Sequence, residues 1–470
     1  MHSKADHFKE NSRRQLGDAT LQQNMRRFGG RFAQARAVAM EELPDLEALR
    51  DQAAAIRDRS LYQLDEWLLR FEAQAKNAGI TVHWAATGAE VNRIVLEIAQ
   101  AADVRKVVKS KSMVSEETGL NEALIGAGLH VVETDLGEYI LQLAEEPPSH
   151  LIAPALHKNV EEVADLFAAH HHTPRQTDIP SLCREARVQL RPHFLDADMG
   201  ITGGNFLIAE TGSVVLVTNE GNGRMVTTLP RVHVAITGIE KVLPTLDDLT
   251  TLLKLLPRSA TGQSITNYVS LLTGPRHDDE REGPSQSHII LVDGGRSEVL
   301  GTALQPALRC IRCGACMNHC PVYQNIGGQA YGWVYPGPIG AILTPAYLGL
   351  DQARDLPQAA TLCGACEVVC PVRIPLPALM RELRQQSVQQ GLRPWRERLG
   401  VRLWHWLALH PRSYRWFSRV LIWGLSKMAN AQGMVTRLPG LDGWTQGRDM
   451  PAPQGASFHS LYRKTSRKTS

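Results

Sequence analysis

Seven of the eight cysteines in this 470-residue sequence lie between positions 310 and 370. Four of them follow the spacing Cys-x2-Cys-x2-Cys-x3-Cys and precede a proline: Cys310, Cys313, Cys316 and Cys320. This spacing is typical of bacterial iron–sulfur proteins, in which the first three thiolates bind one cluster and the fourth reaches a second cluster. Zinc also binds Cys-x2-Cys pairs, but three cysteines at successive short spacings crowd a single tetrahedral ion. The run therefore predicts iron–sulfur clusters.

A partial copy of this run follows, with three further cysteines before Pro371. When the two copies are aligned on the Cys-Gly-Ala-Cys that they share, Ala360 occupies the first cysteine position of the second copy. In such paired runs the fourth cysteine of each copy binds the cluster of the other copy. This exchange assigns four thiolates to a first cluster and three to a second. The predicted first set is Cys310, Cys313, Cys316 and Cys370, and the predicted second set is Cys320, Cys363 and Cys366.

The second cluster then lacks a fourth thiolate. The sequence leaves several sources of that ligand open: His319, Cys183, an oxygen of solvent or substrate, a residue of a partner protein, or a cluster with only three irons. Cys183 stands far from the other cysteines in the sequence, which is typical of a buried thiol on a helix. We expect two [4Fe-4S] clusters that lie close together and carry one electron each; a fourth ligand other than cysteine is among the alternatives for the second.

The elements that must position the cysteines divide the sequence into four segments. Residues 1–58 predict a basic helical leader. In 59–300 strands alternate with helices, which indicates parallel pairing and an α/β layer fold; we expect the early strands at 80–84, 104–108, 130–133 and 151–153. Residues 301–378 predict an α-helical ferredoxin-type domain. Residues 379–470 predict a helical, basic, Trp-rich extension with a break at His410 and Pro411.

A second set of candidate residues lies in the α/β segment, just past an expected strand. Lys109, Lys111 and Glu116 follow that strand, and Asp135 follows the next one. Open α/β sheets place ligand sites at such strand ends, so two lysines there could hold a carboxylate or a phosphate; the alternative is a solvated loop. Glycine- and asparagine-rich turns at 200–205, 210–213 and 219–224 could approach a ligand closely, although hairpin turns at positive φ are the favoured interpretation.

Charge and composition narrow the class of protein. The chain is 43% hydrophobic and has 51 basic against 48 acidic side chains, which argues against disorder and against nucleic-acid binding along the chain. From residue 373 onward, however, 17 basic side chains face 4 acidic ones, and six of the nine tryptophans lie there. No apolar run approaches the roughly 20 residues of a membrane span. We expect a cytoplasmic protein whose C-terminal helices lie on the inner face of a membrane, dock on an acidic partner or cover the clusters.

Several stretches resemble one known family. The stretches are 109–117, 135–140, 208–212 and 218–224, which look like a LUD (lactate utilization) domain. Joined to the two cysteine motifs and the basic extension, the chain is similar to the lactate utilization protein B family from roughly residue 20 to residue 460. The resemblance implies a LUD fold akin to the sugar-isomerase and CoA-transferase class, with two four-iron clusters on the cysteine sets given above. It also implies two companion proteins that take part in oxidising L-lactate to pyruvate.

Three functions are consistent with these features. The first is an iron–sulfur electron-transfer subunit of an L-lactate oxidoreductase complex, which passes electrons to a partner or to a membrane quinone. No GxGxxG or Walker motif is present, so binding of NAD, FAD or ATP through those motifs is unsupported. The second makes the LUD domain the substrate site, with Lys109 and Lys111 binding a carboxylate and Glu116 or Asp135 as the base. The third is a redox sensor or scaffold.

Overall fold

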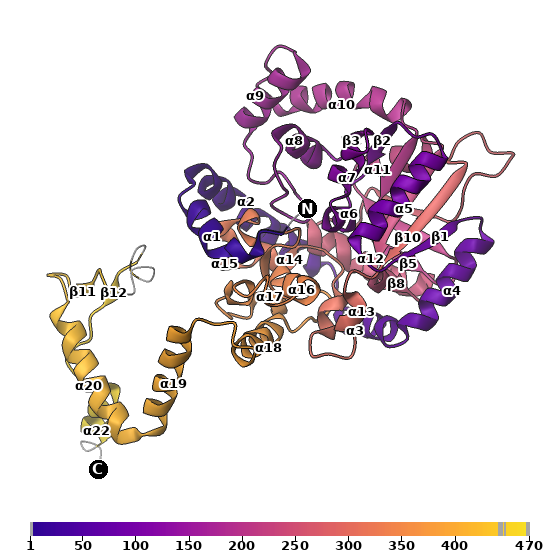
Figure 1. Cartoon of the computed structure of the whole chain (residues 1–470). Helices are drawn as coiled ribbons and strands as arrows, with labels where there is room; N and C mark the ends of the chain where they lie inside the picture. Colours follow the sequence, from indigo (N-terminus) through magenta and orange to yellow (C-terminus); the bar gives the residue numbers. More distant parts are fainter. Residues whose placement is uncertain (1–2, 440–444, 446–447, 467–470) are drawn as a thin grey trace. The chain divides into compact units, whose positions relative to one another are not determined.

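The computed structural model describes residues 3–439, 445 and 448–466, and the chain forms two compact units that meet at Gln390 and Gly391 (Figure 1). The first unit contains the LUD-like segment and the cysteine segment packed together. The second unit contains most of the basic extension. Each unit is described separately below.

The centre of the first unit is a six-stranded sheet in which every neighbouring pair is parallel (Figure 1). Its order is β1 (Thr81–Ala85), β10 (Gln286–Val292), β7 (Val232–Gly238), β4 (Met199–Thr202), β2 (Lys106–Lys109) and β3 (His130–Glu133). The α/β layer is therefore confirmed. The strand expected at 151–153 is wrong, because the ring Nδ1 of His150 accepts the backbone N–H groups of Ile152 and Ala153 and leaves them unable to join a sheet.

Helices cover both faces of this sheet. One face carries α5 (Gly88–Ala101), α6 (Met113–Thr118) and α7 (Leu120–Gly126). The other carries α8 (Leu136–Ala144), α9 (Val160–His171), α10 (Ile179–Leu195) and α11 (Asn222–Thr228). Successive strand residues point to opposite faces, so Val107 packs in the first core and Val108 in the second. The connections after β2 and after β4 thus lie on opposite sides of the sheet.

A smaller four-stranded sheet lies beside the first. Its order is β8 (Val242–Leu243), β5 (Phe206–Ile208), β6 (Ser213–Thr218) and β9 (Tyr268–Leu272). Strands β5 and β6 form an antiparallel hairpin, and Gly212 in its turn has a φ of +70°, which glycine adopts without strain. The helix α4 (Leu64–Asn77) packs Leu68 and Phe71 against this region, and α12 (Leu246–Ala260) begins at a capping box formed by Thr245 and Asp248.

The cysteine segment is built from short helices, as the ferredoxin-type prediction expected. They are α13 (Arg296–Val299), η3 (Gln305–Arg309), α14 (Ala315–Asn318), α15 (Pro321–Ile326), η4 (Gln329–Tyr331), α16 (Gly337–Leu348), η5 (Leu356–Gln358), α17 (Ala365–Val368) and α18 (Leu376–Gln389). The leader forms η1 (Ala5–His7), α1 (Phe8–Leu16), α2 (Ala19–Glu41) and α3 (Leu46–Tyr62). The leader packs on the cysteine segment, because Arg36 in α2 donates to the carbonyl of Val369 at 2.9 Å.

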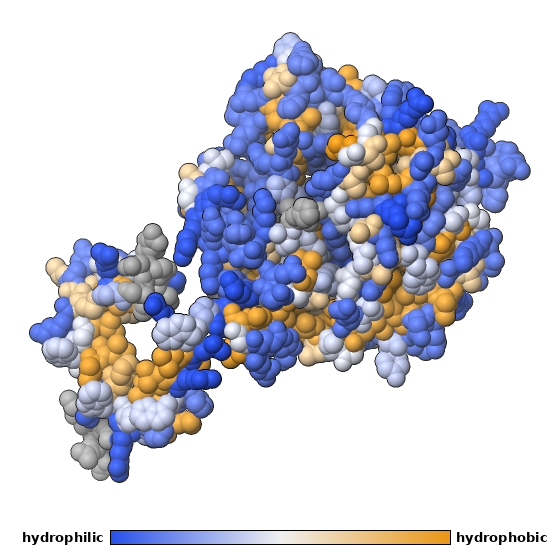
Figure 2. All heavy atoms as spheres, in the orientation of Figure 1, coloured by the Kyte–Doolittle hydropathy of each residue, from blue (hydrophilic) through white to orange (hydrophobic). Residues whose placement is uncertain are grey.

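The second unit consists mainly of two helices, α19 (Trp395–Leu409) and α20 (Pro411–Lys427), separated at His410 as predicted. Two short strands, β11 (Met434–Val435) and β12 (Met450–Pro451), and α22 (Phe458–Ser466) complete it. Among its described residues, Val435 is the one hydrophobic side chain that is buried. Apolar side chains cover much of its visible surface in Figure 2. Across the described residues, no helix is both long enough and apolar enough to cross a membrane.

Candidate iron–sulfur site and adjoining cavity

The two cysteine motifs adopt the same backbone conformation. In the first, Arg312 and Gly314 have φ values of +61° and +73°; in the second, Leu362 and Gly364 have +57° and +84°. Residues other than glycine rarely adopt such angles, so their recurrence at equivalent positions is specific. A four-residue helix, α14 or α17, follows each glycine. The second motif therefore keeps the fold of the first although it lacks the first cysteine.

Four of the thiols lie within electrostatic range of one another. The pKa of Cys313 is raised to about 12, chiefly by burial and also by the thiols of Cys310 and Cys370. Burial raises the pKa of Cys316 as well, followed by the effects of the other three thiols. Thiols influence one another in this way only at short range, so the four form one group. This group coincides with the predicted first set.

The remaining three motif cysteines form a second group. The pKa of Cys366 is raised to about 12, chiefly by burial and also by Cys320 and Cys363. Cys363 is exposed, and its pKa is lowered, chiefly by a hydrogen bond from the backbone N–H of Ala365. Cys316 of the first group also lies within electrostatic range of Cys366. The two groups are therefore neighbours.

The surroundings of these sulfurs fit iron–sulfur clusters. Backbone N–H groups of Arg312 and Ile374 each donate to a cysteine Sγ at 3.4 Å, on Cys310 and Cys370 respectively. Amide donors stabilise the thiolate, which is the form that binds iron, and hydrogen bonds to sulfur tune a cluster's potential. Cysteine thiolates with amide donors are the donor set of such clusters.

Five cations surround the first group of thiols. Each one lies within electrostatic range of a thiol of that group: Arg36, Arg50, Arg57, Lys241 and Arg312. The ammonium of Lys241 donates to the carbonyl of Cys310 at 3.0 Å, and Arg50 donates to the carbonyl of Cys370 at 2.9 Å. The pKa shifts within the second group come from burial, backbone amides, the hydroxyl of Thr361 and the group's own thiols. The two groups thus sit in electrostatically different surroundings.

Glu240 is the centre of a buried ionic network beside the first group. Arg296 Nε binds its Oε2 at 2.7 Å and Arg312 Nη2 lies 3.3 Å from its Oε1, while Arg57 binds its backbone carbonyl. Burial alone would raise the pKa of Glu240, but the surrounding cations outweigh burial and hold it at about 2. Arg296 also forms a bidentate pair with Glu117 at 2.7 and 3.0 Å. The network joins the LUD-like sheet to the cysteine segment.

The four candidate residues in the LUD-like segment separate into two pairs, Lys109 with Glu116 and Lys111 with Asp135. Lys109 is buried, and its ammonium binds Glu133 and Asn121 at 2.6 Å each and lies 3.5 Å from Glu116. Burial alone would lower the pKa of Lys109, but the neighbouring carboxylates raise it. Lys111 and Asp135 line a cavity instead, although Asp135 Oδ1 also accepts two backbone N–H groups that begin α8.

This cavity has a volume of about 390 Å³ and lies between the sheet and the cysteine segment. The loops after β2 and β4 form one part of its wall, and Ile311, Arg312 and Tyr335 form another. The turns at 203–205 and 219–222 also line it, and Gly203, Gly204, Gly221 and Gly223 are not at positive φ. The hairpin interpretation is therefore wrong for these two turns and holds for Gly212. A Cβ at Gly203 would lie 3.1 Å from Ser112 Oγ, so glycine here permits close packing.

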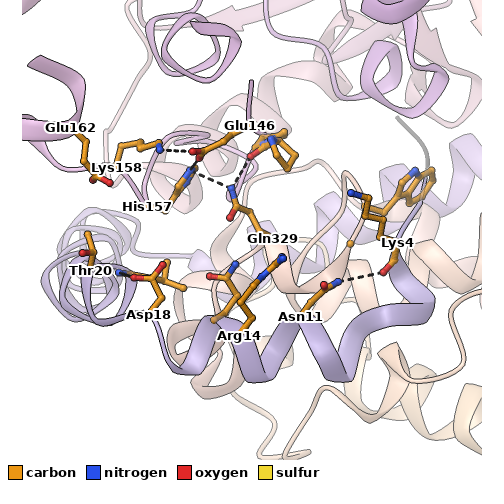
Figure 3. Close-up of a pocket in the computed structure, with 16 residues that line it drawn as sticks. Lys4, Asn11, Arg14, Asp18, Thr20, Glu146, His157, Lys158, Glu162 and Gln329 are labelled. Atoms are coloured by element: carbon orange, nitrogen blue, oxygen red, sulfur yellow. Dashed lines mark hydrogen bonds and ion pairs between the residues drawn. The ribbon is translucent and has the colours of Figure 1, made fainter. Parts of the chain in front are cut away.

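A second cavity, of about 440 Å³, lies beside the N-terminal helices (Figure 3). Three of its charged groups pair with one another: Glu146 binds His157 at 2.8 Å and Lys158 at 2.5 Å. Gln329 lies 3.2 Å from the same histidine (Figure 3). Because these groups already satisfy each other, this cavity offers less to a ligand than the first.

Neither His319 nor Cys183 joins the thiol groups by its visible contacts. His319 Nδ1 bonds to the carbonyl of Ala315 at 2.9 Å. Cys183 is exposed on α10, where it lines a hollow with Leu182 and Phe167, so its predicted burial is wrong. The fourth ligand of the second group remains open.

Comparison with known proteins gives the family. Residues 68–292 match the LUD domain model, 306–374 the 4Fe-4S dicluster domain model, and 381–467 the model of the C-terminal region of lactate utilisation protein B. Lactate utilization protein B of Shouchella clausii (strain KSM-K16) is 43% identical over 458 residues, which cover 97% of this chain and 96% of that protein. The chain belongs to the lactate utilization protein B family.

Other members extend the comparison. Lactate utilization protein B of Geobacillus thermodenitrificans (strain NG80-2) is 44% identical over 91% of this chain and 90% of that protein. The "Uncharacterized electron transport protein YkgF" of Escherichia coli (strain K12) is 41% identical over 97% of this chain and 96% of that protein. A crystal structure of a DUF162 family protein from Deinococcus radiodurans covers 49% of this chain and 98% of that one, with 14% identity and a TM-score of 0.28, too low to support an argument.

Proposed function

We propose that this chain is the iron–sulfur electron-transfer component of a system that oxidises L-lactate to pyruvate. The single observation that carries the proposal is the arrangement of seven cysteines in two neighbouring groups with amide donors to their sulfurs. The family's 4Fe-4S dicluster domain and the printed names of its members support both the cofactor and the metabolic setting.

The first [4Fe-4S] cluster is held by Cys310, Cys313, Cys316 and Cys370, and the second by Cys320, Cys363, Cys366 and one ligand that is not cysteine. Oxidation of lactate releases two electrons, and each cluster carries one at a time. The thiols of the first group are largely buried, whereas Cys363 of the second group is exposed. Electrons therefore pass from the first cluster to the second, whose exposed edge is accessible to an acceptor. Hydride removal takes place on a companion protein of the same system.

Substitution of single cysteines tests the ligand assignment. Cys310→Ala and Cys370→Ala are expected to remove the same cluster, and Cys363→Ala the other. Iron analysis and EPR of the anaerobically purified variants measure the loss, with Cys183→Ala as the matched control that keeps both clusters. If Cys310→Ala and Cys370→Ala abolish different EPR signals, the exchange of fourth ligands is wrong.

Addition of substrate tests the metabolic assignment. Anaerobic EPR of the chain, reconstituted with its companion proteins, is expected to show reduced clusters after L-lactate and none after D-lactate. Clusters that stay oxidised with L-lactate, while dithionite reduces them, would favour the redox-sensor or scaffold function instead.

We also infer that the C-terminal unit holds the protein at an anionic membrane surface, where a quinone can accept the electrons. From residue 391 onward the sequence has 14 basic side chains against 3 acidic ones. Interfacial helices combine such basic residues with exposed tryptophan and leucine, as α19 and α20 do.

A further inference from the structure

The cavity beside the first group of thiols lies where open α/β sheets place their ligands. Its wall includes Ser110, which follows β2, and Gly203, which follows β4. These strands are neighbours in the sheet, and the connections that follow them run to opposite faces. Loops that part in this way leave a crevice at the carboxyl ends of the strands, which is the general ligand position in such folds.

The wall of this cavity is rich in cationic groups. Lys111, Lys241 and Arg312 line it, and the side chains of Lys241 and Arg312 are only 7% and 11% exposed. Within the described part of the chain, Nη1 of Arg312 is buried and has no hydrogen-bond partner. A buried guanidinium nitrogen without an acceptor is costly, and an anionic oxygen removes that cost.

The carboxylates of the wall leave room for such an anion. Asp135 Oδ1 is engaged in capping α8, and Glu220 is exposed. Asn205 contributes an amide to the wall, while Leu216 and Ile311 contribute apolar surface. A ligand that matches this wall has a carboxylate, a hydroxyl or carbonyl oxygen and a small apolar part.

We propose that this cavity binds a small 2-hydroxy or 2-oxo carboxylate anion, with Lys111, Lys241 and Arg312 facing its carboxylate. The choice of that acid rests on the proposed function in lactate oxidation. Because Ile311 and Arg312 lie between Cys310 and Cys313 in the sequence and also line the cavity, a bound anion lies against the loop that holds the first cluster. The ligand then contacts the cluster domain and the LUD domain at once.

Anaerobic calorimetry of the full, cluster-loaded chain tests the proposal with L-lactate, pyruvate and inorganic phosphate as probes. Lys111→Gln is expected to weaken binding of L-lactate or pyruvate at least tenfold, since one charge-assisted hydrogen bond contributes about 1.5–3 kcal/mol. Lys106→Gln is the matched control: Lys106 lies at the start of β2, the strand that Lys111 follows, and pairs with Asp196 outside the cavity, so this variant is expected to bind normally.

A second variant and a spectroscopic measurement complete the test. Arg312→Lys keeps a cation beside Cys310 and Glu240 but removes the guanidinium Nη1, and it is expected to weaken binding of the acid; its iron content is measured alongside to verify that both clusters are present. The bound acid is expected to shift the EPR signal that Cys310→Ala removes and to leave the other signal unchanged. Absence of binding in a chain with both clusters intact overturns this inference and leaves electron transfer untouched. Equal affinity for phosphate overturns the assignment to an organic acid.

Discussion

Glu240 is the carboxylate that compensates the charge of four buried cations beside the first group of thiols. Arg57, Lys241, Arg296 and Arg312 all lower its pKa, and Lys241 itself has a pKa near 7, lowered by burial and then by Arg312. Breaking a buried ion pair by removal of one partner leaves an uncompensated charge in a medium of low dielectric. The single carboxylate therefore holds the two domains together at this point.

We predict that Glu240→Gln destabilises the first unit by about 3–5 kcal/mol, the cost of leaving buried cations without their partner. Chemical denaturation followed by circular dichroism measures the change, and Glu298→Gln, on the exposed side of α13, is the control with little effect. The folded-state pKa of about 2 lies below the ordinary value, so this stabilisation is present above pH 4.5 and is lost as pH falls toward 2. A variant as stable as the control at pH 7 would contradict the role of Glu240.

Sequence alone identified the cysteines but not their neighbours. Spacing sufficed to predict which thiols group together, because sulfurs that surround one cluster must lie within a few residues of one another. Lys241 and Arg57 come from a strand end and from the leader, and only tertiary packing brings them to Cys310. Lys109 shows the converse error of inference, since a lysine after a strand suggests a ligand site and here forms a buried ion pair with Glu133.

At the scale of elements, the sequence predicted most helices and strands and missed how the leader packs. Amphipathic periodicity and caps such as that of Asn159 and Glu162 depend on nearby residues and are legible locally. The helices α2 and α3 bring Arg36 and Arg50 to the thiols over some 300 positions of sequence, and no local signal reports such a contact. The strand expected at 151–153 failed for a different, local reason, because the ring of the adjacent His150 accepts its backbone N–H groups.

Three neighbouring strands carry a group of neutral histidines. His83 on β1 bonds to His288 on β10 at 3.1 Å, and His233 on β7 bonds to Thr202 at 3.0 Å. The pKa of His233 is lowered to about 4, chiefly by burial and also by the neighbouring His288. Protonation would place charge in the buried sheet.

We predict that His233 makes the sheet sensitive to acid. Its folded-state pKa lies below the unfolded value of about 6.5, so the unfolded chain binds the proton first and stability falls as pH drops from about 6.5 to 4. The loss from this residue between pH 7 and 4.5 is about 2–3 kcal/mol. Denaturation at a series of pH values measures it: His233→Gln is expected to flatten the dependence, and exposed His277→Gln to leave it unchanged. Equal slopes in all three proteins would refute the prediction.

At the scale of the whole molecule, the two units differ in what covers their apolar side chains. The first unit has well-defined hydrophobic cores, whereas seventeen large hydrophobic side chains are exposed among the described residues of the second unit. Along α20, Trp416, Val420 and Trp423 are spaced to share one face and are 66%, 46% and 66% exposed. An apolar face of this size requires an external partner.

We predict that the full chain binds vesicles that contain anionic phosphatidylglycerol and does not bind purely zwitterionic vesicles. Replacing both Trp416 and Trp423 by alanine is expected to weaken binding about tenfold or more, because each tryptophan buries a large apolar surface. Co-sedimentation measures binding, raised salt is expected to weaken it, and Tyr62→Ala, an exposed aromatic of the first unit, is the control. Failure to sediment with anionic vesicles at low salt would exclude the membrane as the partner.

The exposed position of Cys363 also governs how long the protein survives in air. Oxidation of a cysteine follows its thiolate character and its exposure, and Cys363 combines a lowered pKa with an exposed side chain. The exposed side chain proposed above to face an electron acceptor is equally accessible to dioxygen and peroxide. Oxidative damage is therefore expected to begin at Cys363. In a cell that respires aerobically, iron and sulfide must then be supplied to rebuild the cluster that this cysteine holds.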